Sequence, residues 1–280
     1  CLNKKGWVFD DAEHRYTICL TTLNKKRKKI INTYGQINNL NEFKKIKYLN
    51  KAKFEYKEIK NWTDCVVVPI LSSEKAIDIF RKIRKFNNFL DEKSNFWIAR
   101  PHSDVHPTND KHMFSFETKQ PKGSWPIYSG DSFNLFEFNH EKTYAWINKD
   151  EIVKKLNERR KRSRERDNSV FTNFDAKWFQ NENTLPCFYP RIVFRGITNR
   201  TNNRTLIVSL APPKCILAGK APYLLFSNAS IEDQLFVLGI FSSRIMDWYV
   251  RKIVETDIAY YLLNYFPCPR VHKKDNNYKR

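Results

Sequence analysis

Glycine is scarce in this chain of 280 residues and is never clustered. The seven glycines each stand alone, at positions 6, 35, 123, 130, 196, 219 and 239. A site that brings the backbone against S-adenosylmethionine or a nucleotide uses a glycine-rich turn, because side chains would block that approach. A glycine-lysine phosphate loop and a serine elbow are absent as well. The sequence therefore predicts no complete catalytic site and no cofactor site within this chain.

Closely spaced cysteines and long apolar runs are also missing. The six cysteines lie far apart, with no Cys-x-x-Cys, at positions 1, 19, 65, 187, 215 and 268. This spacing argues against a zinc site or a disulfide framework and is typical of free thiols in a reducing cytosol. No apolar run reaches the roughly 18 residues that a membrane span needs. We expect a cytoplasmic protein and, because the chain begins at Cys1 with no signal-like stretch, a piece of a longer one.

Acidic residues are few relative to basic ones. The chain has 50 lysines and arginines against 30 aspartates and glutamates, a formal net charge of +20. Such an imbalance costs self-repulsion, and a polyanionic partner, above all nucleic acid, is the usual compensation. The alternative is that scattered lysines only reflect an AT-rich genome. The 41% hydrophobic and 15% aromatic content indicates a folded protein.

The pattern of apolar and turn residues predicts an α+β fold. Strand-like runs occur within residues 6–23 and 53–68, and a strand pair is expected at 125–138. Residues 100–126 hold many turn formers and four prolines, which favours a long loop or linker. We expect mainly antiparallel, twisted sheets with packed helices in two subdomains, residues 1–120 and 121–280.

Capping residues mark two expected helices. Ser73 can cap a helix over residues 73–90 that carries an apolar stripe. Ser230 and Asp233 form a capping signature at the start of a helix over residues 230–252. Both apolar stripes are more typical of core packing than of a functional surface.

A third helical pattern, over residues 150–167, begins with an apolar face and ends in a dense run of cations. Five arginines and a lysine stand against two acids in residues 158–166. The cations are Arg159, Arg160, Lys161, Arg162, Arg164 and Arg166. This run could follow a phosphate backbone, or it could equally be a solvated helix end or a mobile loop.

The segment from Pro190 to Leu210 carries the most specific pattern. It predicts a strand, a polar tip and a second strand over Leu206 to Leu210. Arginine presents a fork of donors that fits guanine edges or phosphate, and asparagine can pair with adenine. The candidate DNA-contacting residues are Arg195, Asn199, Arg200, Asn202, Asn203 and Arg204. The alternative is a solvated hairpin, because asparagine, threonine and glycine also simply form turns.

Other candidate chemistry fails on spacing. His102, His106 and His112 share a polar loop with two interleaved aspartates, but their spacing matches no compact zinc pattern. The Pro212-Pro213 pair lacks the polar and aromatic neighbours that DNA-amino-methylating enzymes place around theirs. We therefore expect no metal site and no catalytic residue.

Several stretches, in chain order, follow one known pattern. The segment 190–210 is similar to "PRI-x-FR-x-I…TNeRT", and 126–130 is similar to "P-l-Y-x-G". The other matching stretches are Phe9 to Leu23, Phe96 to Phe114, Ile240 to Trp248 and Tyr261 to Pro269. The chain thus resembles the region after the methyltransferase core of type IIG restriction-modification enzymes and related phage-defence adenine-N6 DNA methyltransferases. Its second half resembles the C-terminal specificity domain of Taq-type enzymes.

The resemblance implies a division of labour. A missing upstream part would bind S-adenosylmethionine and methylate adenine, and an endonuclease domain often precedes it. Residues 1–120 would follow that core, and residues 121–280 would form the target-recognition domain, which holds double-stranded DNA and reads its sequence. The partners implied are DNA and the upstream methyltransferase domain, with no membrane. The chain departs from the pattern at Pro101, where an acid is usual, and keeps only His140 of an aspartate-histidine-arginine stretch.

Two other functions remain open at this point. The chain could clamp DNA without reading its sequence, or dock a partner subunit. It could also be an autonomous nuclease, although short Glu-x-Lys triplets are expected by chance in a chain this rich in lysine. Competition between specific and nonspecific DNA separates sequence reading from clamping, and metal-dependent cleavage would reveal a nuclease.

Overall fold

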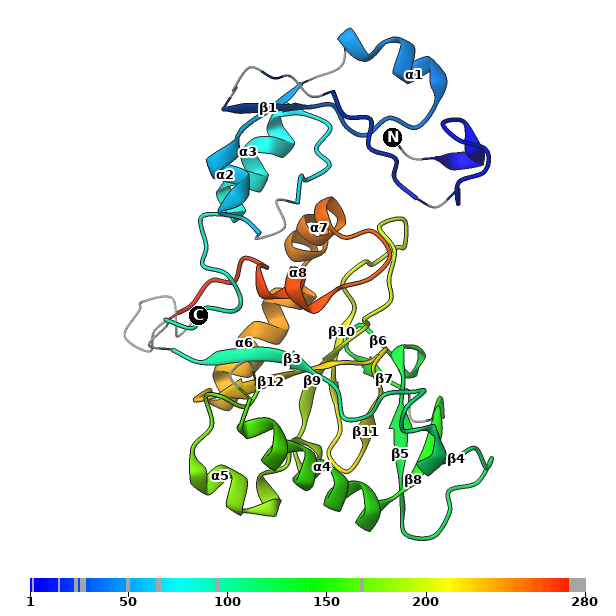
Figure 1. Cartoon of the computed structure of the whole chain (residues 1–280), viewed down its shortest axis with the longest axis vertical. Coiled ribbons are helices and arrows are strands. Elements are labelled where there is room, and N and C mark those ends of the chain that lie inside the picture. The colour runs from blue at the N-terminus through cyan, green and yellow to red at the C-terminus, as the bar shows by residue number, and fades with distance from the viewer. Residues whose placement is uncertain are drawn as a thin grey trace.

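The chain folds as the α+β protein that the sequence predicts, with mostly antiparallel strand pairs. The computed structural model describes residues 1–271 except residues 2, 15, 23, 24, 26–28, 49, 50, 64–66, 94, 95, 140, 167 and 168. His140 of the resemblance therefore lies outside the described residues. Figure 1 shows an elongated molecule, with two four-stranded sheets towards one end and the N-terminal residues at the other.

Two four-stranded sheets and two ribbons make up the β-structure. The central sheet has the order β10-β9-β12-β3 and is antiparallel throughout: β3 (Ile98–His102), β9 (Arg191–Phe194), β10 (Val208–Ala211) and β12 (Tyr223–Ser227). The second sheet has the order β11-β5-β8-β4: β4 (Phe114–Ser115), β5 (Ser124–Tyr128), β8 (Ala145–Asn148) and β11 (Ile216–Leu217). Only its β11–β5 pair is parallel among the described strand pairs. The ribbons join β1 (Ile30–Thr33) to β2 (Ala52–Glu55) and β6 (Phe133–Asn134) to β7 (Glu137–Phe138).

The helices of the described residues are spread along the molecule from the N-terminal end to the opposite one (Figure 1). They are α1 (Leu40–Lys44), α2 (Tyr56–Lys60), α3 (Glu74–Ile83), α4 (Lys149–Arg164), α5 (Ala176–Gln180), α6 (Ile231–Ser242), α7 (Arg244–Ile253) and α8 (Tyr260–Asn264). Short 3-10 turns lie at Lys4–Gly6, Ile46–Tyr48, Lys111–Met113, Gly130–Ser132, Glu182–Thr184 and Pro186–Phe188. No helix in this part of the chain is long and apolar enough to cross a membrane.

The two capping predictions are confirmed, but both helices are shorter than expected. Ser73 accepts from the N–H of Ala76 at the start of α3, which ends at Ile83. Ser230 begins α6 with a capping box, but the helix expected over 230–252 is broken at Ser243. Ser243 has extended backbone and caps α7, because its hydroxyl accepts from the N–H of Met246. The prediction of one long helix is therefore wrong: two helices follow one another, separated by the extended residue Ser243.

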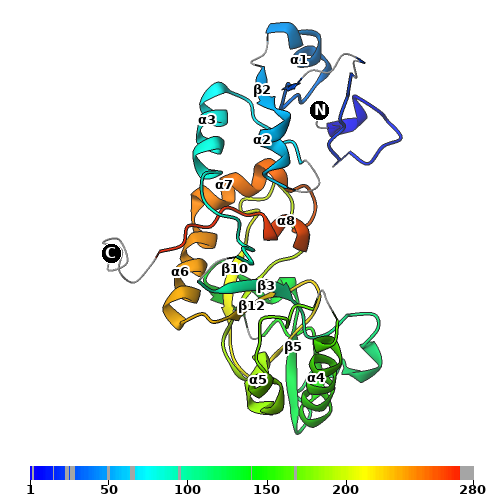
Figure 2. The same ribbon diagram turned by 60° about the vertical axis from the view of Figure 1, so that its left-hand side comes forward.

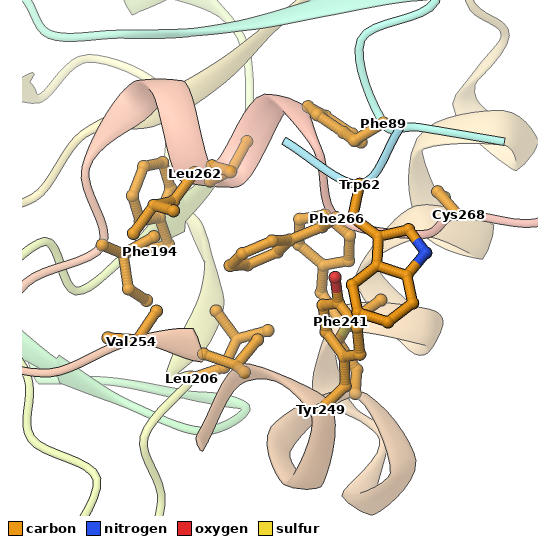
Figure 3. Packing of buried hydrophobic residues seen from close by; sticks show 14 of the residues in the cluster. Trp62, Phe89, Phe194, Leu206, Phe241, Tyr249, Val254, Leu262, Phe266 and Cys268 are labelled. Atoms are coloured by element: carbon orange, nitrogen blue, oxygen red, sulfur yellow. The ribbon is translucent and has the colours of Figure 1, made fainter. Parts of the chain in front are cut away.

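The main hydrophobic cluster joins the N-terminal helices to the C-terminal ones. Phe80 of α3 stacks on Tyr249 of α7 with ring centroids 4.9 Å apart, and Phe89 lies 5.2 Å from Phe241 of α6. Figure 3 shows Trp62 and Phe89 beside Phe241, Tyr249 and Phe266. Residues on both sides of position 120 thus share one core. The division into 1–120 and 121–280 stays a prediction.

Two loop and strand expectations are corrected by the structure. Residues 100–126 do not form a linker, because they contribute the end of β3, all of β4 and the start of β5. The described residues of 6–23 form no strand pair. Instead, buried Asn3 holds a turn by accepting from the N–H groups of Val8 and Phe9 and donating to two carbonyls. The Asn3 amide, together with backbone hydrogen bonds between Asn3 and Tyr16 and between Cys1 and Ile18, holds this segment where the apolar alternation suggested a strand pair.

Candidate nucleic-acid interface

The two predicted DNA-contacting groups lie in different parts of the molecule. Helix α4 lies at the lower end, whereas the tip between β9 and β10 reaches up to α7 (Figure 1, Figure 2). The tip is fixed there by Arg251 of α7, whose guanidinium donates to the carbonyls of Arg200 and Asn203. The structure does not bring the two groups onto one continuous surface.

The strand, polar tip and second strand expected after Pro190 are present as β9 and β10. Val208 pairs with Phe194 and Ala211 with Arg191. Buried Asp247 of α7 anchors the return of the tip, because its carboxylate accepts from the N–H groups of Thr205 (2.7 Å) and Leu206 (2.9 Å). The same carboxylate accepts from Arg251 (2.9 Å). The tip is therefore a docked element and not a free loop.

The three arginines of this segment that were candidate DNA contacts are engaged within the protein. Arg195 donates to the carbonyls of Gly130 (2.8 Å) and Phe133 (2.6 Å). Arg204 donates to the carbonyl of Ser242 at the end of α6. The side chain of Arg200 is only 13% exposed and lies 3.9 Å from Glu255. These guanidiniums hold loops together, so their role as base readers is not supported by this arrangement.

The asparagines of the tip divide into two kinds. The side-chain oxygen of Asn199 accepts from both the N–H and the hydroxyl of Thr201, which closes a local turn. Asn202 and Asn203 are exposed. Of the residues predicted in this segment, these two amides have the access that a base contact needs.

Helix α4 presents an apolar face to the second sheet and a basic face to solvent. Asn148 caps it by accepting from the N–H groups of Asp150 and Glu151. Ile152, Val153 and Leu156 are buried. The cationic run, for which the sequence left a phosphate contact, a solvated helix end or a mobile loop open, is helical as far as Arg164.

Arg160 is a correction to the predicted DNA-contacting set. It is 1% exposed, and its guanidinium donates to Asn157, to the hydroxyl of Thr184 (2.8 Å) and to the carbonyl of Asn181 (2.8 Å). It also lies over the ring of Trp178 at 4.6 Å. Arg160 therefore ties α4 to the segment around α5 and cannot reach a phosphate.

Arg159 has a mixed environment on the same helix. Its guanidinium donates to the carbonyl of Asp104 and lies 3.2 Å from the carboxylate of Asp110. Lys155 binds the same carboxylate at 2.7 Å. Arg159 is half-buried. Asp110 offsets its charge, but the guanidinium still borders the surface.

The remaining cations form what we call the α4 basic surface: Lys161, Arg162, Arg164 and Arg166, all exposed. One hollow of about 330 Å³ lies between the side chains of Arg159, Arg162, Ser163 and Arg166. A second, of about 370 Å³, is lined by Arg164, Glu165, Arg166, Phe171, Thr172 and Phe174. Arg166 borders both. Arginine forks around open hollows suit phosphate oxygens, which they can bind in pairs.

These cations also complement the C-terminal end of the α4 dipole, which favours positive side chains in the last turn. That effect accounts for cations at the helix end in general. In addition, the two hollows are lined by four arginines, Arg159, Arg162, Arg164 and Arg166, and by a single acid, Glu165.

The polar loop that contains His102, His106 and His112 is held in place by the buried carboxylate of Asp104. Asp104 pairs with Arg191 at 2.6 Å and accepts from the N–H of Leu217, with all three groups buried. His106 accepts through Nδ1 from the N–H groups of the two residues that follow Pro107. Among the described residues no three histidine, cysteine or acidic side chains gather as metal ligands do.

Sequence reasoning missed the anchoring roles of Asp104, Asp247 and Arg251. Asp247 stands next to Trp248 in the closing stretch of the resemblance, and Arg251 follows it at i+4 on the same helix. That i, i+4 pairing was the available signal. No comparable signal marks Asp104, because its partner Arg191 lies 87 residues away.

No protein-family model matches the sequence. No curated protein matches it significantly either.

Proposed function

We propose that this chain binds double-stranded DNA through the α4 basic surface. The observation that carries the proposal is the grouping of the exposed Arg162, Arg164 and Arg166 around two open hollows, beside exposed Lys161, in a chain with a net charge of +20. Contacts from arginine to phosphate supply affinity and register without depending on sequence, and they make binding sensitive to salt.

Sequence reading, as the resemblance suggests, would use a separate contact, at the tip between β9 and β10. In this proposal the chain is the target-recognition portion of a type IIG-like adenine-N6 DNA methyltransferase, and S-adenosylmethionine and catalysis belong to the upstream part. Asn202 and Asn203 are the exposed amides available for base edges. The sequence motifs support this role, and the exposure of these two amides is compatible with it.

A clamp that does not read sequence is the second candidate, and one observation favours it. Arg195, Arg200 and Arg204, the strongest base-reading candidates by residue type, are occupied by contacts inside the protein. Under this alternative, the upstream domain or a partner subunit would supply specificity.

Selection from randomised duplex DNA at two salt concentrations, followed by sequencing of the retained pool, separates these functions. Enrichment of one short asymmetric site that contains adenine supports the recognition domain. Salt-sensitive retention without enrichment supports the clamp. Absence of retention at low salt contradicts both, because a chain with this charge and surface would then serve another partner.

A further inference from the structure

The turn between β6 and β7 holds an exposed phenylalanine in an unusual backbone conformation. Two residues, Leu135 and Phe136, join the strands, whose last paired positions are Asn134 and Glu137. Phe136 has φ of 60°, in the left-handed region, and its side chain is 71% exposed. Glycine or asparagine normally occupies such a position, because a bulky side chain there is sterically strained.

Phe136 therefore carries two costs at one position, backbone strain and exposure of an aromatic ring to water. Its neighbour Leu135 packs against the main hydrophobic cluster and shows no such exposure. Strained residues persist where the surrounding structure holds them, and they concentrate at binding and functional positions. The combination points to an external contact for the ring.

The base of this turn is rigid. Phe133 stacks on Phe138 across the ribbon at 5.8 Å with an interplanar angle of 9°, and Phe138 meets Tyr128 edge-on at 4.7 Å. Arg195 donates to the carbonyl of Phe133, which ties the ribbon to the segment after β9. Figure 1 shows β6 and β7 beside β10. A stiff hairpin that presents one apolar side chain has the form of a wedge.

We propose that Phe136 inserts between adjacent base pairs of bound duplex DNA and partly unstacks them; this rests on the proposed DNA binding. Proteins that bend DNA use single apolar side chains in this way. A protein partner would call for a contiguous apolar patch, whereas Phe136 is flanked by exposed Asn134 and Glu137. The net charge of +20 also disfavours a second copy of the chain as the occupant.

Three substitutions at position 136 distinguish insertion of the ring into DNA from a purely structural role of Phe136. Phe136→Gly and Phe136→Asn both accept a left-handed backbone but remove the apolar ring. Phe136→Leu keeps an apolar wedge. Phe86→Ala is the matched control, because Phe86 is another phenylalanine with 50% exposure whose backbone is not left-handed.

The probe is a short duplex whose central TA step carries 2-aminopurine in place of adenine, since this step unstacks easily. We expect its fluorescence to rise when the wild-type chain binds at low salt. The Gly and Asn variants should lose this rise, bind roughly tenfold more weakly, and unfold at the same or a higher temperature than the wild type. Phe136→Leu and Phe86→Ala should behave like the wild type.

The outcomes test the insertion of Phe136 separately from the DNA binding on which it rests. Duplex binding by the wild type without a fluorescence rise overturns the wedge and leaves DNA binding in place. A Gly variant that binds and unstacks the duplex as the wild type does also overturns it, because the ring would then play no part in unstacking. No duplex binding by the wild type overturns the proposed function and the wedge together.

Discussion

His102, at the end of β3, is a residue whose protonation differs between the folded and the unfolded chain. Its ring meets Phe171 edge-on at 5.2 Å and Tyr223 at 5.6 Å. Burial, assisted by the charges of Arg159 and Arg191 and opposed by Asp104, lowers its pKa from 6.5 to about 4. Between these two values the unfolded chain binds more protons than the folded one, so the free energy of unfolding falls as pH drops from 6.5 towards 4.

We expect this histidine to account for up to about 3 kcal/mol of stability lost across that interval. Urea unfolding of the wild type and of His102→Gln at pH 7.5, 5.5 and 4.5 measures it, and the variant should show the shallower pH dependence. His112→Gln, at an exposed histidine, is the control. Parallel pH curves for wild type and His102→Gln would contradict the assignment.

Residue type alone could not tell the structural arginines from the exposed ones. Arg195 is fixed by the carbonyls of Gly130 and Phe133, more than 60 residues earlier in the chain. No local sequence pattern predicts these contacts. Arg160 was more accessible to reasoning, because it follows Val153 and Leu156 at helical spacing on the buried face. The same spacing places Arg159, Arg162 and Arg166 together on another face, where they line one hollow.

At the scale of elements, the α4 basic surface makes a quantitative prediction. Replacing Arg162, Arg164 and Arg166 together by alanine should weaken duplex binding at low salt by roughly tenfold or more and reduce the slope of log K against log salt by about 2 to 3. Loss of the favourable dipole interaction should cost no more than about 1 kcal/mol of stability. Fluorescence anisotropy over a salt series, with thermal unfolding alongside, measures both effects.

The matched control removes three cations elsewhere. Lys75, Lys82 and Lys85, in and just after α3, are exposed and can be replaced together by alanine. This variant has the same net charge as the arginine variant. Equal losses of affinity and slope in the two variants would show that total charge, and not the α4 surface, drives binding.

Elements with strong local signals were predicted well, and those that depend on partners were not. Ser73 and Ser230 locate two helix starts because a hydroxyl cap is a local interaction. Ser242-Ser243 could have indicated the break between α6 and α7, since serine favours caps over helix interiors. The end of β3, residues 100–102, was mistaken for loop because it contains Pro101. As the outermost strand of its sheet it tolerates a proline, a position that no local pattern reveals.

For the whole molecule, the contacts that bridge the two halves are backbone as well as side chain. The N–H of Phe89 donates to the carbonyl of Phe266 (2.7 Å), and that of Cys268 donates to the carbonyl of Asn87 (2.8 Å). Arg84 donates to the carbonyl of Tyr265 (2.6 Å). The α+β class follows from the mixture of patterns in the sequence, but pairing over such distances depends on tertiary packing. A domain boundary predicted from proline and turn-forming residues takes no account of such long-range pairing.

This shared core makes a prediction about unfolding that tests the division at residue 120. We expect residues from β2 to the end of α8 to unfold in one cooperative transition, with equal calorimetric and van't Hoff enthalpies. Phe80→Ala, which empties the site stacked on Tyr249, should cost about 3 to 5 kcal/mol and lower the midpoint of that single transition by roughly 6 to 15 °C. Leu210→Ala, at a 43% exposed position on β10, should shift it far less. Two resolved transitions, of which Phe80→Ala moves only one, would instead support independent folding of residues 1–120 and 121–280.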